Sequence, residues 1–150
     1  MTDLRYSFSG FNSSNRILIL DTSLNDPHSK PGNDDKVLMK DLMRNSLAVV
    51  KTPRNVIPTT CVLYGCSFGE RVYDWPEKGH GAFTYYLLEG MRGKAFDAQG
   101  RLTVQGLGSH VEKQVPQWSA RSGKTQTPCY EQTGSPRDIC LAIRGVDTAT

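Results

Sequence analysis

The chain has 150 residues, of which 37% are hydrophobic and 22% charged, and its formal net charge is +3 at pH 7. These values fit one globular domain with a single core. They argue against a nucleic-acid-binding protein, because no basic run is interleaved with aromatic residues. The sequence has no apolar stretch near the ~20 residues that a membrane helix needs, and its first residues lack a signal-peptide pattern. We therefore expect a cytoplasmic protein that makes no contact with nucleic acid or membrane.

The cysteine spacing argues against a metal centre. The four cysteines are Cys61, Cys66, Cys129 and Cys140. Outside the secretory path they are expected to remain reduced thiols. The first pair does not have the spacing of a zinc knuckle, and no histidine stands beside the second pair. We expect neither a metal nor another cofactor.

The first third of the chain contains one strong strand signal. Residues 16–21 (R-I-L-I-L-D) form a short apolar run, which is typical of a strand buried on both faces of a parallel sheet. Before it, residues 1–15 are polar and are expected to be a frayed start. After it, the turn formers of 22–36 predict a loop. A short helix is predicted within 37–50, followed by an irregular segment over 51–58.

The middle of the chain predicts a strand, a loop and a helix. Residues 59–66 (T-T-C-V-L-Y-G-C) are rich in β-formers and predict a second strand. A long loop is expected over 67–81. Residues 82–92 predict an amphipathic helix that ends at Gly93, because apolar side chains recur at helical spacing: Phe83, Leu87, Leu88 and Met91.

The last third predicts a capped helix and a final strand. A turn is expected at 97–100, after which Thr103 caps a helix whose buried stripe is Leu107, Val111 and Val115. Pro116 is expected to end that helix or mark its last turn. A loop follows over 119–137, and 138–143 (D-I-C-L-A-I) predict the last strand. This order of elements indicates an α/β fold with a largely parallel sheet.

Short motifs follow one another in a distinctive order between residues 61 and 128. The second strand runs into C-S-F-G-E, then Y-D at 73–74, then G-H-G-A-F-T at the start of the helix, and Q-T-P stands at 126–128. Upstream, residues 21–27 read D-T-S-L-N-D-P. In this order and spacing the chain resembles the second half of bacterial caspase-family proteins (peptidase family C14, related to metacaspases), whose upstream motif is D-A-C-R-N-D-P.

The resemblance covers residues 16–143 and implies a caspase-hemoglobinase-like fold. That fold is a three-layer α/β sandwich with a mostly parallel sheet, and its N-terminal part is expected to be missing here. We treat residues 1–150 as a single partial caspase-like domain in which 144–150 form a tail. The resemblance also implies cysteine endopeptidase ancestry.

Ser23 occupies the place of the family's catalytic cysteine. The resemblance puts the catalytic histidine one strand earlier, in a Ser-Gly-His-Gly segment that is expected to precede this chain. A serine hydroxyl is far less acidic than a thiol and needs a well-placed base. Two interpretations stay open: Ser23 is a nucleophile, or the site is degenerate and the serine bonds locally in its turn.

A second pair of residues offers an alternative dyad. Gly79-His80-Gly81 is similar to the family's catalytic Gly-His-Gly, and Cys66 ends a nearby strand. A cysteine–histidine dyad needs only spatial contact, which sequence does not exclude. The alternative is that Cys66 packs as a small apolar residue and that His80 belongs to a turn.

Four residues after the second strand are substrate-binding candidates. The resemblance places Ser67, Glu70, Tyr73 and Asp74 along the substrate cleft, where caspases carry an arginine. A carboxylate at this place favours a cationic partner, so a preference for Arg or Lys is expected. The alternative is that Asp74 is a solvated acid on a loop.

These features together predict a catalytically degenerate fragment of a caspase-family cysteine endopeptidase. Whether any enzymatic activity remains stays open. The expected partners are a peptide or protein substrate with basic residues and a second chain that completes the exposed edge of the sheet. The alternative is a non-catalytic protein-interaction module.

Overall fold

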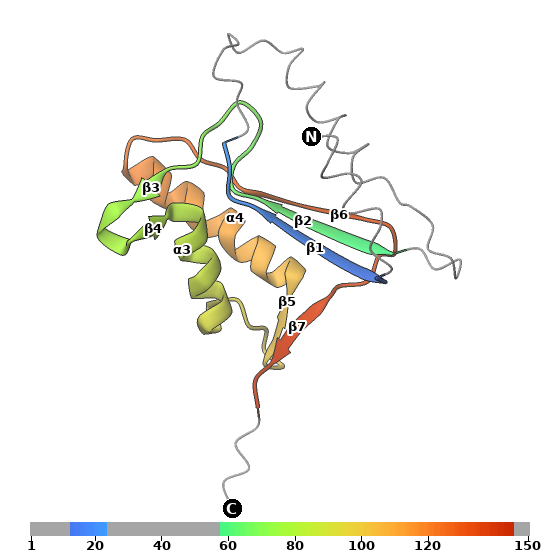
Figure 1. Ribbon diagram of the computed structural model, residues 1–150. Coiled ribbons are helices and arrows are strands. Elements are labelled where there is room, and N and C mark those ends of the chain that lie inside the picture. Colours follow the sequence, from blue (N-terminus) through green and yellow to red (C-terminus); the bar gives the residue numbers. More distant parts are fainter. Residues whose placement is uncertain (1–12, 24–57, 146–150) are drawn as a thin grey trace, which may run out of the picture.

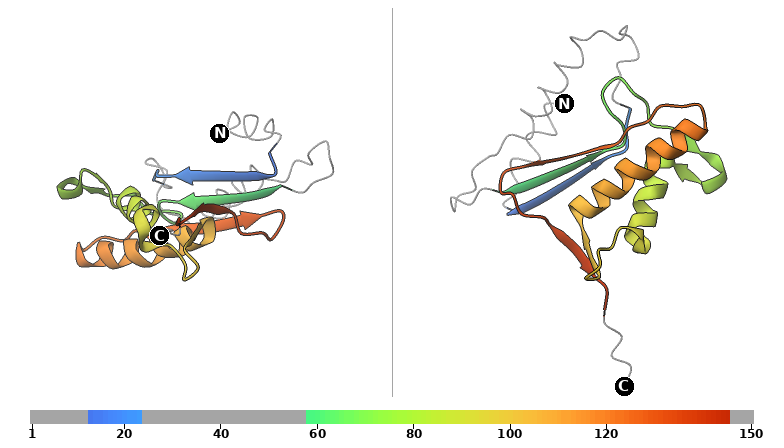
Figure 2. Two further views of the ribbon diagram at one scale, coloured as in Figure 1. Left: turned by 90° about the horizontal axis from the view of Figure 1, so that it is seen from below. Right: turned by 180° about the vertical axis from the view of Figure 1, so that it is seen from behind.

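The computed structural model describes residues 13–23 and 58–145. They form a mixed α/β arrangement in which α3 and α4 lie on the same side of a three-stranded sheet (Figure 1). The views from below and from behind in Figure 2 show the same placement. The predicted start of the chain up to residue 12, and the loop, helix and irregular segment predicted between residues 24 and 57, lie outside the described residues.

The central sheet has the order β1-β2-β6. β1 (Asn15–Leu20) runs parallel to β2 (Thr59–Tyr64), which confirms the two strands predicted from apolar runs. β6 (Cys129–Thr133) runs antiparallel to β2. It lies in the stretch for which the sequence predicted a loop. That prediction was wrong because the C-Y-E-Q-T segment is too polar to signal a strand and is ordered by pairing with β2.

β2 is the centre of the core and is buried along its whole length. Alternate side chains of a strand point to opposite faces, so Cys61 and Leu63 pack with the helices, while Val62 and Tyr64 pack with Cys66 on the other face. β1 is less buried than predicted, because Ile19 is 40% exposed. The prediction of burial on both faces, made for the run at 16–21, therefore fails for β1, whereas β2 is the strand that is buried on both faces.

The helices supply the other half of the core. α3 (Ala82–Glu89) continues into a wider helical turn, η2 (Gly90–Lys94), and α4 spans Val104–Arg121. The predicted cap is confirmed, since Thr103 Oγ1 accepts a hydrogen bond from Gly106 N at 3.0 Å. The predicted stripe is confirmed as well, since Leu107, Val111 and Val115 are buried. They form one core cluster with Phe83 and Leu87 of α3 and with residues of β2.

α4 passes through Pro116 and does not end there. The proline costs the helix one backbone hydrogen bond, because its nitrogen carries no hydrogen. The turns beyond it are held by burial, since Trp118 is 8% exposed and Ser119 is 2% exposed. Packing of Trp118 and Ser119 thus overrides the local stop signal at Pro116, and the predicted end of the helix was wrong.

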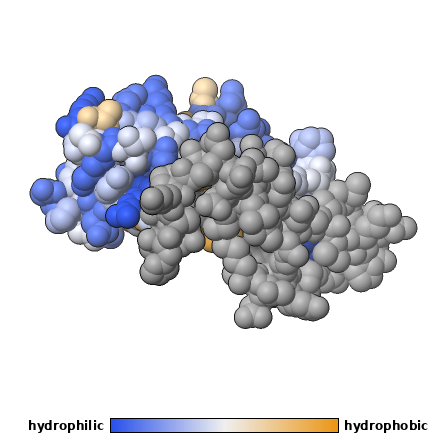
Figure 3. All heavy atoms as spheres, turned by 90° about the horizontal axis from the view of Figure 1, so that it is seen from above, coloured by the Kyte–Doolittle hydropathy of each residue, from blue (hydrophilic) through white to orange (hydrophobic). Residues whose placement is uncertain are grey.

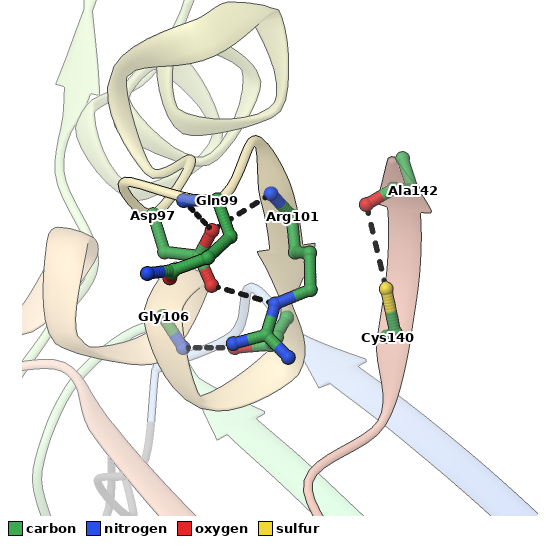
Figure 4. Close-up of polar contacts among 7 residues, drawn as sticks. Asp97, Gln99, Arg101, Gly106, Cys140 and Ala142 are labelled. Carbon is green, nitrogen blue, oxygen red and sulfur yellow. Dashed lines mark hydrogen bonds and ion pairs between the residues drawn. The ribbon is translucent and has the colours of Figure 1, made fainter. Parts of the chain in front are cut away.

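A separate ribbon lies beyond the sheet. β5 (Arg101–Thr103) pairs antiparallel with β7 (Cys140–Ile143), so the last predicted strand is confirmed but does not join the central sheet. The turn before β5 is built by Asp97, whose carboxylate accepts hydrogen bonds from Gln99 N (2.9 Å), Arg101 N (2.8 Å) and Arg101 Nε (2.9 Å) (Figure 4). These donors lower the pKa of Asp97.

His110 is a half-buried titratable group between α3 and α4. Its Nε2 lies 3.7 Å from Glu89 Oε2, and a Cβ placed on Gly90 would lie 3.1 Å from its Cδ2. Burial lowers the pKa of His110, Lys94 and Lys113 lower it further, and Glu89 opposes them. The folded protein therefore prefers the neutral imidazole.

This lowered pKa predicts acid-dependent stability. The unfolded chain binds the proton first as the pH falls below roughly 6.5, the ordinary histidine value. The stability associated with His110 is thus complete above that pH and is lost as the pH falls through the lower pKa of the folded state. Urea unfolding at pH 7.5 and 5.5 should show a smaller loss for His110→Gln than for the wild type. Parallel profiles for the two proteins would contradict this assignment.

Candidate functional site

The carboxyl ends of β1 and β2 define one edge of the sheet. The chain leaves β1 through Asp21–Ser23 and leaves β2 at Gly65, whose N–H donates to the Leu20 carbonyl at 2.7 Å. Because the two strands are parallel, both exits lie side by side. In α/β proteins this edge is where ligands commonly bind.

Asp21 carries its carboxylate into the middle of this edge. Thr84 Oγ1 of α3 donates to Asp21 Oδ2 at 2.5 Å. A Cβ placed on Gly65 would lie 3.0 Å from Asp21 Oδ1, and one on Gly81 would lie 3.3 Å from Oδ2. The carboxylate thus lies against two glycines that leave it room. Sequence reasoning missed Asp21 as a site residue, although an acid directly after a parallel strand was a usable signal.

Ser23 accepts a hydrogen bond from a distant segment of the chain at the same edge. Its side chain is exposed, and Oγ accepts a hydrogen bond from Val72 N at 3.4 Å. Within the described part of the chain no histidine is hydrogen-bonded to it. The bond connects the exit of β1 to the loop after β2, 49 positions away in the chain, and is therefore not the bond within its own turn that the sequence left open.

Cys66 and His80 are not brought together by a hydrogen bond in the described segments. Cys66 is fully buried, and its single S–H has two carbonyl oxygens within reach, those of Thr22 (3.6 Å) and Glu70 (3.5 Å). His80 is exposed in β4 (His80–Gly81), opposite Trp75 of β3 (Asp74–Trp75). In this geometry the thiol is shielded from solvent and from any substrate.

The Gly-His-Gly motif has a conformational basis here. Gly79 follows the short helix η1 (Pro76–Lys78) with φ of 69°, and its N–H donates to the Pro76 carbonyl at 3.0 Å. Such a left-handed residue favours glycine. Gly81 lies against the Asp21 carboxylate. Gly79 thus turns the chain, and Gly81 makes room for Asp21. His80 takes part in neither of these roles.

Glu70 and Ser67 connect the loop after β2 to the segment before β6. Glu70 Oε2 accepts hydrogen bonds from Thr127 N (2.6 Å) and Ser67 N (3.3 Å), and Oε1 accepts from the Thr127 hydroxyl at 3.1 Å. The Ser67 hydroxyl donates to the Thr127 carbonyl at 2.8 Å. Both carboxylate oxygens of Glu70 are therefore occupied within the protein.

Tyr73 and Asp74 lie at the start of the β3–β4 hairpin. Tyr73 N–H donates to Gln126 Oε1 at 3.1 Å, and Lys124 Nζ lies 4.9 Å from the centre of its ring. Asp74 is exposed and is the strand partner of Gly81. Gly81 also lies against the Asp21 carboxylate, so the Asp74 backbone pairs with a glycine that borders Asp21.

An aromatic cluster anchors the hairpin to the helices. The Trp75 ring centre lies 4.9 Å from that of Tyr85 and 5.1 Å from that of Trp118. Lys78 Nζ lies 5.6 Å from the Trp75 ring centre. These contacts fix the hairpin, and with it Asp74 and Gly81, relative to α3 and α4.

In residues 13–23 and 58–145 no group of three or more His, Cys, Asp or Glu side chains is arranged to hold a metal ion. No helix in this part of the chain combines the length and apolarity needed to cross a membrane. Compared with known proteins, the chain matches no family model, no curated protein and no solved structure.

Proposed function

We propose that the chain is a catalytically degenerate caspase-like domain that binds a basic side chain of a peptide at the carboxyl ends of β1 and β2. The observation that carries this proposal is the Asp21 carboxylate, which is oriented by Thr84 and lies against Gly65 and Gly81. The three-layer sandwich with a mostly parallel sheet belongs to the same proposal. The parallel β1–β2 pair and the helix layer on one side of the sheet support it, whereas β6 departs from a parallel sheet because it runs antiparallel to β2.

The geometry of the nucleophile candidates favours binding without hydrolysis. A serine or cysteine nucleophile needs an adjacent base or a lowered pKa. Ser23 Oγ accepts a backbone hydrogen bond from Val72, and the single S–H of Cys66 faces two backbone carbonyls inside the protein. None of these bonds, all of which are to backbone groups, activates an attacking atom.

The cation preference follows from Asp21 and Asp74. A guanidinium group forms forked, charge-assisted hydrogen bonds with a carboxylate. The Asp21 carboxylate borders Gly81, and Asp74 is exposed on the strand that pairs with this glycine, whereas the Glu70 oxygens are engaged by Thr127 and Ser67. The preference is therefore expected to depend on Asp21 first and Asp74 second.

A labelled peptide with one arginine should bind more tightly than the same peptide with citrulline, which has nearly the same shape without the charge. For an ion pair at an exposed carboxylate the expected ratio of affinities is roughly fivefold. Fluorescence anisotropy measures it. Asp21→Asn should remove the ratio, Asp74→Asn should reduce it, and the matched control Ser23→Ala should leave it unchanged.

Equal affinities for the arginine and citrulline peptides would overturn the cation preference. Hydrolysis of Arg, Lys or Asp reporter peptides that disappears in Ser23→Ala would show that Ser23 is a nucleophile. Hydrolysis that disappears in both Cys66→Ala and His80→Ala would instead support the alternative dyad. Either result would overturn the proposal that the site is catalytically degenerate.

A second chain that pairs with a strand edge is also proposed. In the described part of the chain β7 pairs only with β5, and Leu141 and Ile143 are 38% and 70% exposed. An apolar edge strand is a template for pairing. On the face seen from above in Figure 3, the coloured residues are largely hydrophilic.

Sedimentation velocity should therefore show association that grows with concentration and weakens in Ile143→Lys. Met91→Lys is the control, since Met91 is equally apolar and 40% exposed but lies in η2. A strictly monomeric wild type at every concentration would contradict the proposal of a completing chain, as would equal effects of the two substitutions.

A further inference from the structure

A series of hydrogen bonds frames the edge at which Asp21 lies. Gly65 N donates to the Leu20 carbonyl at 2.7 Å, and Gln126 Nε2 donates to the Gly65 carbonyl at 2.8 Å. Tyr73 N donates to Gln126 Oε1 at 3.1 Å, and Ala82 N donates to the Tyr73 carbonyl at 2.9 Å. The series runs from the end of β1 to the start of α3, and Gln126 is its one side-chain member.

Gln126 is an unusual residue to bury. It is 1% exposed, and a buried amide is costly unless its polar atoms are paired. Both ends of its amide are used, and Ser119 Oγ accepts from its backbone N–H at 3.3 Å. The side chain bridges the two ends of the loop after β2, at Gly65 and Tyr73, much as a neighbouring strand would.

Gln126 holds the backbone of two residues near Asp21: Gly65 borders the carboxylate directly, and Tyr73 contacts Gly81, which borders it as well. A Cβ on Gly65 would lie 3.0 Å from Asp21 Oδ1, and one on Gly81 would lie 3.7 Å from the Tyr73 carbonyl oxygen. Gln126 therefore fixes the spacing between Gly65 and the Tyr73–Gly81 contact, although none of its hydrogen bonds involves Asp21.

We propose that Gln126 is a positioning residue that sets the cation preference of Asp21 by holding Gly65 and Tyr73 in register. This inference rests on the proposed function of the site. Gln126 would act without contacting the ligand itself. It lies 53 positions after Tyr73 in the chain. Thr127, the next residue, also holds the loop after β2, because its N–H donates to Glu70.

A double-mutant cycle tests this inference on the full chain. The proteins are the wild type, Asp21→Asn, Gln126→Met and the double variant, and the probes are the arginine and citrulline peptides. Gln126→Met should bring the roughly fivefold affinity ratio close to one. In the Asp21→Asn background Gln126→Met should not change the affinity ratio further, because the effects of substitutions at interacting residues are non-additive. Hydrogen exchange of the Tyr73 amide should accelerate in Gln126→Met.

A purely structural role predicts a different pattern. In that case Gln126→Met lowers the melting temperature but leaves the arginine-to-citrulline ratio of the folded protein unchanged, which overturns the inference while the proposed function stands. An Asp21→Asn variant that keeps the full ratio overturns the proposed function itself. If Gln126→Met does not fold, Gln126→Glu replaces it, since the carboxylate keeps an acceptor for Tyr73 and loses the donor to Gly65. An unchanged ratio in that variant likewise overturns the inference.

Discussion

Gly108→Ala is expected to lower the free energy of unfolding by about 1–3 kcal/mol, the usual cost of overpacking a core. Gly108 is buried in α4, and a Cβ placed there would lie 2.9 Å from Tyr130 Cβ and 3.0 Å from Tyr130 Cγ. Those atoms are close to the backbone of β6 and cannot rotate away. The contact would push α4 off the sheet and outweigh the gain of about 1 kcal/mol in helix propensity.

Urea unfolding followed by circular dichroism measures this effect. Ser109→Ala is the matched control, because Ser109 is the next residue of the same helix and is exposed. The control should be neutral or slightly stabilising. If Gly108→Ala is as stable as Ser109→Ala, then α4 and β6 do not approach each other as closely as the structure indicates.

Gln126→Met is expected to cost about 2–4 kcal/mol of stability. The substitution conserves volume, but it leaves the Gly65 carbonyl and the Tyr73 N–H without the partners that Gln126 supplies. Each buried backbone group that loses its hydrogen bond costs roughly 1–3 kcal/mol. The loop after β2 should loosen first, because both of its ends are held by this side chain.

The control for this prediction is Gln117→Met, the same change at an exposed position of α4. Thermal unfolding of the two variants should differ by several degrees, with Gln126→Met the less stable. Equal melting temperatures would mean that Gly65 and Tyr73 find other partners and that the buried amide is dispensable.

Elements with strong local signals could be predicted from the sequence. The apolar run at 17–20 and the β-formers at 59–64 gave β1 and β2. The spacing of Phe83 and Leu87 gave α3, and Thr103 marked the start of α4 because its hydroxyl bonds the first turn. In each case the periodicity or the cap is a property of neighbouring residues.

Elements whose order depends on distant partners could not be predicted. β6 carries Glu131 and Gln132 in its centre and becomes a strand by pairing with β2. β5 is three residues long and is defined by β7. α4 continues past Pro116 because Trp118 is buried beyond it. In these segments tertiary packing outweighs local propensity.

The candidate site was predicted in part. Ser67, Glu70 and Tyr73 do lie in the loop that leaves β2 at the site edge, but their hydrogen bonds hold that loop. Asp21 and Gln126 were missed as site residues. Their roles depend on the approach of Gly65 and Gly81 to one carboxylate and on a bridge between distant backbone groups, and sequence spacing does not encode such proximity.

The most direct test of the account is a titration of the ¹⁵N-labelled chain with N-acetylarginine N-methylamide, followed by amide chemical shifts. A cation site at Asp21 predicts saturable shifts centred on Gly65 and Gly81, which lie against the Asp21 carboxylate, and on Thr22, the next residue in the chain. They should be absent with the citrulline analogue and in Asp21→Asn. Shifts of equal size with citrulline, or shifts that persist in Asp21→Asn, would contradict a cation site at the carboxyl ends of β1 and β2.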